Sequence, residues 1–294
     1  MTQNIIQMCH VTKSFGPKVV LDGLDFNLQR GTVTGLLGKN GAGKTTLLKC
    51  ALGLQTPQSG TITVFGEPAR DLSATTKAKL AYVPQEVTLY PWMKIRQIVA
   101  YTRAFYPHWN DSLIERLLKD WELGVEERVG TLSTGQMQKL SILLGLGHEP
   151  ELLVLDEPVA SLDPSARRQF LATLLEIAIS GDRTILFSTH ITSDLERVAD
   201  HVAVLKAGKV VYHDELSALK DSVKRVRIVN ARALPVTKQD LPGVLHWESS
   251  DANAVLSVDN FTPELPERLS REWQAEVTVE DLNLEEIFLE LHHG

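Results

Sequence analysis

A run of glycines followed by lysine and threonine occupies residues 38–46. It reads Gly-Lys-Asn-Gly-Ala-Gly-Lys-Thr-Thr and fits the spacing G-x-x-x-x-G-K-[ST] of a phosphate-binding loop. Glycines let such a loop curl so that successive backbone N–H groups point at an anion, and the next helix presents its positive N-terminus to the same place. The rival dinucleotide pattern G-x-G-x-x-G is absent. The residues expected to hold a nucleotide here are Gly38, Asn40, Gly41, Ala42, Gly43, Lys44, Thr45 and Thr46.

Within this loop, Lys44 and Thr45 supply the chemistry that backbone groups lack. Lys44 offers a mobile positive charge to the β- and γ-phosphates, and the Thr45 hydroxyl is a ligand for Mg²⁺. The loop therefore predicts a site for a magnesium-bound nucleoside triphosphate.

Two adjacent acids, Asp156 and Glu157, follow the apolar run 152–155. A buried strand would deliver Asp156 to the sheet edge beside the phosphate loop, where a carboxylate can help to hold Mg²⁺. Glu157 could then accept the proton of an attacking water. Gln85 and His190 also follow predicted strands, so Gln85 is a candidate contact to metal or water and His190 to the γ-phosphate. Each of these residues alone is more often an ordinary polar group at a strand end.

The pattern of apolar residues predicts the strands and the helix that must position these residues. Residues 33–37 predict a buried strand before the loop, and a helical pattern follows it. Short strands over residues 5–9, 19–21 and 24–28 predict an antiparallel layer. Phe15 stands at a predicted turn and is a candidate surface for stacking a base.

Residues 86–130 combine helical patterns with a crowd of aromatic side chains. We expect these side chains to belong to a core, and the functional alternative is a docking surface for a helix of a partner. They are Tyr90, Trp92, Tyr101, Phe105, Tyr106 and Trp109.

Residues 221–294 carry none of the phosphate-site residues and predict a small α/β accessory domain. Alternating apolar residues around 226 and 255 indicate short strands. A final helix is predicted to begin after Asn283, with Glu286 completing a capping box.

Composition narrows the class of protein. The 294 residues suffice for a nucleotide-binding domain and a small second domain, and 43% of them are hydrophobic. A net charge of −7 argues against a general nucleic-acid binder, which needs a basic surface. Two cysteines, Cys9 and Cys50, are too few for a disulfide framework. We see no signal-peptide pattern and no apolar stretch near the roughly 20 residues of a membrane span, so any spans would come from another chain.

The order of these features along the chain resembles that of ATP-binding-cassette (ABC) ATPases, the nucleotide-binding subunits of ABC transporters. The resemblance covers roughly residues 3–215. Its motifs are Gly38–Thr46 (Walker A), Gln85 (Q-loop), Leu132–Gln136 (signature), Leu152–Glu157 (Walker B), Ser161–Asp163 (D-loop) and His190 (H-loop).

The resemblance implies a P-loop NTPase fold for residues 1–220, with a mixed β core, an antiparallel β layer and a helical subdomain over about 86–150. It implies that two copies pair head to tail around two ATP molecules with Mg²⁺, each ATP held by Walker A of one copy and by Ser133 and Gly135 of the other. Gln136 belongs to the same signature, and Asp163 would communicate across the interface. Phe15 would stack on adenine. Glu157, His190, Gln85 and Lys44 would be the catalytic residues, and Thr45, Gln85 and Asp156 the metal ligands.

The resemblance also implies a separate transmembrane permease as partner and a cytoplasmic position on the inner face of the membrane. The C-terminal pattern resembles bacterial drug- or ion-export cassettes. Thr134 departs from the family pattern, which has glycine there, and we expect it to restrict the backbone, to add a methyl group at the interface between the two copies, and so to weaken ATP-driven closure. Two alternatives stay open: a soluble ABC ATPase acting on ribosomes or DNA, and a module that closes on ATP without hydrolysis.

Overall fold

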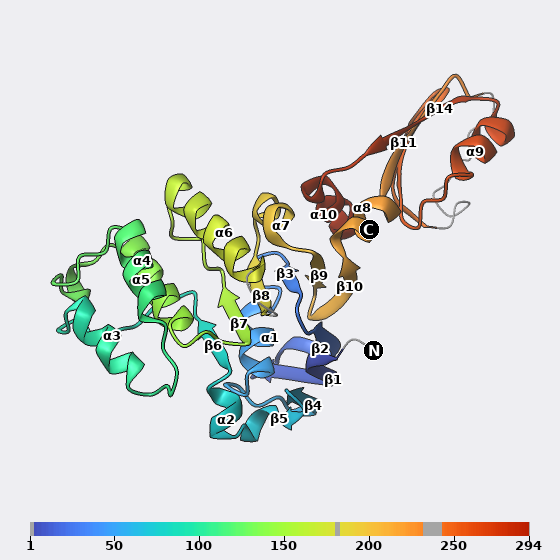
Figure 1. Ribbon diagram of the computed structural model, residues 1–294. Coiled ribbons are helices and arrows are strands. Elements are labelled where there is room, and N and C mark those ends of the chain that lie inside the picture. The colour runs from blue at the N-terminus through green and yellow to red at the C-terminus, as the bar shows by residue number, and fades with distance from the viewer. Residues whose placement is uncertain (1–2, 180–182, 232–242, 294) are drawn as a thin grey trace. The chain divides into compact units, whose positions relative to one another are not determined.

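The computed structural model describes residues 3–179, 183–231 and 243–293. Its contacts divide the chain into two compact units, residues 1–213 and 214–294, which are described separately (Figure 1). Among the described residues, no helix combines the length and the apolar character needed to cross a lipid bilayer.

A six-stranded, mostly parallel sheet forms the centre of the first unit, in the order β10-β9-β3-β8-β7-β6. Every residue of β3, β7 and β8 is buried, which explains why apolar residues predominate in these strands. The loops after β3, β6, β7 and β8 leave the sheet at the same edge, because these strands are parallel. The strands are β3 (Val33–Leu37), β6 (Leu80–Val83), β7 (Leu152–Asp156), β8 (Thr184–Thr189), β9 (His201–Lys206) and β10 (Lys209–Glu215).

A second, four-stranded sheet has the order β2-β1-β4-β5. Its strands are β1 (Asn4–Phe15), β2 (Lys18–Gln29), β4 (Ser59–Val64) and β5 (Glu67–Pro68). The two strands predicted over residues 19–21 and 24–28 are one continuous strand, and Phe15 ends β1 rather than lying in a turn. Helix α1 (Lys44–Ala51) packs between the two sheets, where Leu47 and Leu48 join one apolar core with Phe26 of β2 and Val154 of β7.

Helices complete the first unit. Figure 1 shows α3, α4 and α5 grouped together away from β1 and β2. Helix α4 is capped by Asn110, whose side chain accepts from the backbone N–H of Leu113. The helices are α2 (Ala74–Lys77), α3 (Ile95–Arg103), α4 (Asp111–Asp120), α5 (Thr134–Leu146), α6 (Pro164–Ile179) and α7 (Thr192–Val198), with short 3₁₀ turns at Ala69–Asp71 and Val129–Thr131.

The prediction that the aromatic residues of this region form a core is wrong for four of the six. Tyr90, Trp92, Tyr101 and Phe105 are exposed, Trp92 by 66% and Phe105 by 68%. Their rings touch one another in series, with centroids 5.1 to 5.7 Å apart. They form one surface patch, which we call the aromatic patch, from the loop before α3 through the helix to the residues just after it.

The second unit folds around an antiparallel sheet with the order β12-β13-β11-β14. Helix α9 covers the apolar core of this sheet, which includes Val226 of β11, Leu256 of β13 and Leu269 of α9. The predicted capping box is present: Glu286 N donates to Asn283 Oδ1 and Asn283 N to Glu286 Oε2, both at 3.0 Å. The elements are α8 (Leu216–Ser222), β11 (Lys224–Val229), β12 (Val244–Ser250), β13 (Asn253–Val258), α9 (Leu265–Trp273), β14 (Glu276–Asp281) and α10 (Leu284–His293).

Candidate nucleotide site

The glycine loop lies between β3 and α1, as its motif requires. Gly41 and Gly43 have φ values of 81° and 109°, which residues other than glycine rarely adopt. A Cβ at Gly43 would also stand 3.1 Å from the carbonyl oxygen of Val20. Gly43 caps α1 without a side chain, so the first-turn N–H groups of the helix keep their direction toward the loop. This geometry fits an anion at the helix N-terminus.

Lys44 begins α1 and its side chain turns back over the loop. The residue is 6% exposed. Its Nζ donates to the carbonyl oxygens of Gly38 at 2.7 Å and Lys39 at 3.4 Å. The same Nζ lies 3.0 Å from Oε1 of Glu157, a charge contact without hydrogen-bond alignment. A buried ammonium group is therefore held at the loop and paired with an acid.

The two acids at the end of β7 have different surroundings. Asp156 is fully buried, and its carboxylate accepts from the hydroxyls of Ser188 at 2.7 Å and Tyr82 at 3.4 Å. Burial, with the Asp156 charge close by, raises the pKa of Tyr82, so its hydroxyl stays a donor. Glu157 adopts φ 48° and is 6% exposed. Its Oε2 lies 2.9 Å from Nδ1 of His190, which follows β8.

A cleft of about 510 Å³ joins the loop to the other strand ends. Residues from six segments line it: the end of β1, the start of β2, the loop with α1, and the residues that follow β6, β7 and β8. Ten of the residues singled out from the sequence lie here: Phe15, Asn40, Gly41, Gly43, Lys44, Thr45, Thr46, Gln85, Glu157 and His190. The cleft volume is typical of a small-molecule site.

The remaining sequence-predicted residues do not line this cleft. Gly38 and Ala42 belong to the loop behind it, and Asp156 lies buried at the end of β7. Ser133, Gly135, Gln136 and Asp163 lie elsewhere in the first unit. A single chain therefore does not bring the signature residues to its own phosphate loop.

The signature segment forms the start of α5. Ser133 Oγ accepts from Gln136 N at 3.2 Å, and Ser133 N donates to Gln136 Oε1 at 3.0 Å, which is a complete capping box. Thr134 is the first helical residue and has no positive φ, so this backbone suits threonine as well as glycine. The expected restriction of the backbone by Thr134 therefore loses its support, and the methyl group of its exposed side chain remains as the expected cause of weaker closure.

Asp163 holds the start of α6. Its Oδ1 accepts from the backbone N–H groups of Ser165 at 2.9 Å and Ala166 at 3.0 Å, and these bonds lower the pKa of the Asp163 carboxyl. This local capping role belongs to the single chain, whatever else the side chain contacts.

Two residues of the site escaped the sequence reasoning. Ser188 and Tyr82 both hold Asp156 but belong to no recognised motif. Ser188 stands two residues before His190, so strand alternation places both side chains on one face of β8 and its extension. That alternation is the signal that could have found Ser188.

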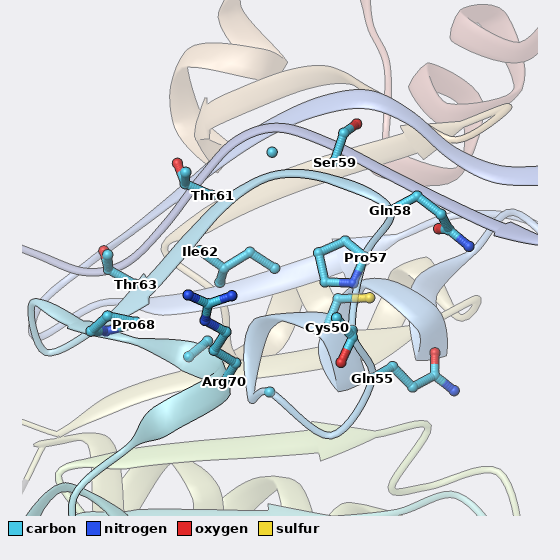
Figure 2. A pocket seen from close by; sticks show the side chains of 14 residues that line it. Cys50, Gln55, Pro57, Gln58, Ser59, Thr61, Ile62, Thr63, Pro68 and Arg70 are labelled. Atoms are coloured by element: carbon cyan, nitrogen blue, oxygen red, sulfur yellow. The ribbon is translucent and has the colours of Figure 1, made fainter.

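A second pocket, of about 480 Å³, lies between the end of α1, β4 and the 3₁₀ turn after β5 (Figure 2). Pro57, Ile62 and Ala69 give it an apolar lining, and Arg70 is its charged residue. None of the phosphate-site residues lines it, so it is separate from the nucleotide cleft.

Comparisons with known proteins agree with this geometry. A family model described as "ABC transporter" matches residues 21–160. A Nod factor export ATP-binding protein I from Burkholderia lata is 33% identical and covers 97% of this chain and 96% of its own length. Another, from Cupriavidus metallidurans, is 35% identical over 74% of this chain and 73% of its own.

The solved structures that resemble this chain belong to the same class of protein. An ATP-binding subunit of an ABC transporter matches with a TM-score of 0.67 and 29% identity, covering 74% of this chain and 92% of that one. A dimeric bacterial ABC transporter cassette matches in fold with a TM-score of 0.64 and 22% identity, over 72% of this chain and 98% of that one. The fold and cleft define an ATP-binding cassette, and the chain belongs to the ABC transporter family. It is an ATP-binding subunit with ATPase activity.

Proposed function

We propose that this ATPase powers export by a separate transmembrane permease, and that two copies pair head to tail around two ATP molecules. The observation that carries the proposal is the division of the site residues. One cleft gathers the phosphate loop, Gln85, Glu157 and His190, while Ser133 and Gly135 lie outside it. A second copy is needed to bring those two residues to a nucleotide.

In each pocket, the residues have distinct tasks. Phe15 is 48% exposed at the cleft edge, where its ring can stack on adenine. Lys44 and the loop N–H groups bind the phosphates. Glu157 accepts a proton from the attacking water, and His190 contacts the γ-phosphate and orients Glu157 through their 2.9 Å contact. Gln85 senses the same site from the end of β6.

The residues also fit Mg²⁺. Thr45, Gln85 and Asp156 offer hydroxyl, amide and carboxylate oxygens, which are the hard donors this ion prefers. Among the described residues, no group of three or more His, Cys, Asp or Glu residues could hold a metal. Mg²⁺ commonly takes one or two carboxylates from the protein and completes its shell with substrate phosphates and water. When bound, the ion would neutralise charge on the phosphates.

The partner and the direction of transport are inferred from relatives and from the surface. Several relatives are named export ATP-binding proteins, which favours transport over a role on ribosomes or DNA. The aromatic patch lies just past Gln85 in the chain, so a permease helix docked there would reach the γ-phosphate site through a short segment. The subunit would then act as a peripheral protein on the cytoplasmic face.

Mixing two inactive variants tests the shared pockets. Lys44→Ala removes the phosphate lysine, and Ser133→Arg blocks the signature. Each alone damages both pockets of a homodimer. In a mixed dimer both defects fall in one pocket and the other is intact, so mixing should restore up to half the wild-type activity per mixed dimer, measured as phosphate release.

A matched mixture provides the control. Lys44→Ala mixed with Glu157→Gln leaves one defect in each pocket, so hydrolysis should stay low. If the Lys44→Ala and Ser133→Arg mixture also stays at the level of its parents, although size exclusion shows mixed dimers, the composite pocket is refuted.

A further inference from the structure

One buried hydroxyl lies between the two acids at the end of β7. Ser188, in β8, is fully buried. Its Oγ accepts from the backbone N–H of Glu157 at 2.9 Å and donates to Oδ1 of Asp156 at 2.7 Å. Both directions are fixed, because an N–H group only donates and an ionised carboxylate only accepts. The proton of Ser188 is therefore committed to Asp156.

The backbone of Glu157 needs such support. Its φ of 48° is uncommon for a residue other than glycine and persists only where the surroundings hold it. Ser188 holds the amide end of Glu157, and His190 holds the carboxylate end. Both contacts come from the end of β8, so one strand end fixes Glu157 at two points.

The two carboxylate oxygens of Asp156 accept hydrogen bonds of different length. The Ser188 contact to Oδ1 is short, whereas the Tyr82 hydroxyl lies 3.4 Å from Oδ2. A charge-assisted hydrogen bond at 2.7 Å is the stronger constraint. Ser188 therefore sets the carboxylate plane, and Tyr82 contributes less.

We propose that Ser188 is a positioning residue for ATP hydrolysis, which orients the metal-binding carboxylate of Asp156 and the backbone of Glu157 with a single hydroxyl. The inference rests on the roles proposed above for these two acids. Groups that orient metal ligands commonly matter by about 10- to 100-fold in metal affinity or activity.

The test compares Ser188→Ala with a control variant that loses another buried hydroxyl of the same strand. Thr184, at the opposite end of β8, is also fully buried, and its hydroxyl accepts from the N–H of Gly31 at 2.9 Å. Thr184→Val therefore removes a buried hydroxyl that accepts from a backbone N–H, as Ser188→Ala does, but it leaves both acids untouched. Thermal unfolding of both full-length variants checks that each is folded.

Two readouts are needed, one of which does not depend on turnover. Ser188→Ala should lower kcat by about 10- to 100-fold with a KM for ATP within about threefold of wild type. Its affinity for Mn²⁺ in the presence of ADP, measured by electron paramagnetic resonance, should fall about tenfold. Thr184→Val should change neither by more than about threefold, and Ser188→Thr, which restores the hydroxyl, should recover most of the kcat.

The inference is overturned if Ser188→Ala matches Thr184→Val in kcat, or if its Mn²⁺ affinity equals that of wild type. A further variant distinguishes a wrong role for Ser188 from a wrong role for Glu157 itself. If Glu157→Gln keeps wild-type hydrolysis, the role of the acid itself is wrong. If Glu157→Gln is inactive while Ser188→Ala behaves like Thr184→Val, only the positioning role is lost.

Discussion

Replacing Glu157 with glutamine should change nucleotide binding and hydrolysis in opposite directions. The carboxylate lies 3.0 Å from the Lys44 ammonium, and both side chains are nearly buried, with exposures of 5% and 6%. Coulomb's law with an effective dielectric constant of about 20 gives this contact about 5 kcal/mol before desolvation. Removing one partner of a buried pair commonly costs about 3–5 kcal/mol of folding stability. Because Lys44 also donates to two carbonyl groups, we expect the lower end of that range.

Nucleotide should recover much of this loss, because its phosphates give Lys44 a new anion. In wild type, Lys44 must exchange Glu157 for phosphate, and the Glu157 charge repels the incoming phosphates. A gain of about 1.4 kcal/mol corresponds to tenfold in affinity, so the variant should bind ATP at least about tenfold more tightly. Hydrolysis should fall by about 10²- to 10⁴-fold, the usual contribution of a general base.

The assay combines ATP titration by calorimetry, thermal unfolding with and without ATP, and phosphate release. Glu151→Gln is the matched control, since Glu151 pairs with Arg30 and Lys79 on the surface, and its loss should cost less than about 1 kcal/mol. Unchanged or weaker ATP binding by the Glu157 variant would refute the competition between Glu157 and phosphate. Hydrolysis within about threefold of wild type would refute its catalytic role.

Three further perturbations have defined outcomes. Gly43→Ala should cost at least about 1–2 kcal/mol in stability and weaken ATP binding more than about tenfold in a titration, because φ is 109° and the new Cβ would meet Val20. Trp92→Ala should change the urea midpoint little, because the ring is 66% exposed, but should abolish stimulation of hydrolysis by the permease; unchanged stimulation and transport would count against docking at the aromatic patch. Burial lowers the pKa of His148 in the folded chain. Below about pH 6.5 the unfolded chain therefore binds a proton at this residue that the folded chain does not bind. As the pH is lowered through this range, the free energy of unfolding should decrease by at most about 1.4 kcal/mol per pH unit. His148→Phe, which can keep the stack on Tyr106, should flatten that slope in urea titrations at about pH 5.5 and 7.5, and an equal slope in both proteins would exclude His148 as its source.

Features that depend on short stretches of chain were predictable. Residues 33–37 are mostly apolar and residues 152–155 are apolar throughout, because both faces of the sheet are covered. The capping box of Asn283 and Glu286 closes within one helical turn, so its residues carry the whole signal. The sequence did not predict α9, because Pro266 in its first turn is equally typical of a break in the chain.

Features that depend on what covers a surface were not predictable in this way. The strands predicted over residues 19–21 and 24–28 were separated, but Gly23 between them has φ 57° and its N–H donates to Thr12 Oγ1 at an irregularity within one continuous β1–β2 ladder. The aromatic patch is apolar in composition, yet the chain leaves Trp92 and Phe105 in solvent. Apolar character predicts burial against something and does not say whether that surface belongs to the same chain.

The candidate site shows the same division. Motif spacing identified Lys44, Glu157 and His190 separately, but their mutual pairing is a property of three strand ends meeting in space. That pairing has a consequence for how the subunit works. The buried ammonium of Lys44 is already paired with Glu157, the acid that we propose as the general base. On that proposal, the phosphates of a nucleotide must replace Glu157 as the partner of Lys44. This replacement leaves Glu157 in contact with His190 and in position to accept a proton. The proposed roles therefore make nucleotide binding and the release of the Glu157 carboxylate from Lys44 a single exchange of partners within the cleft.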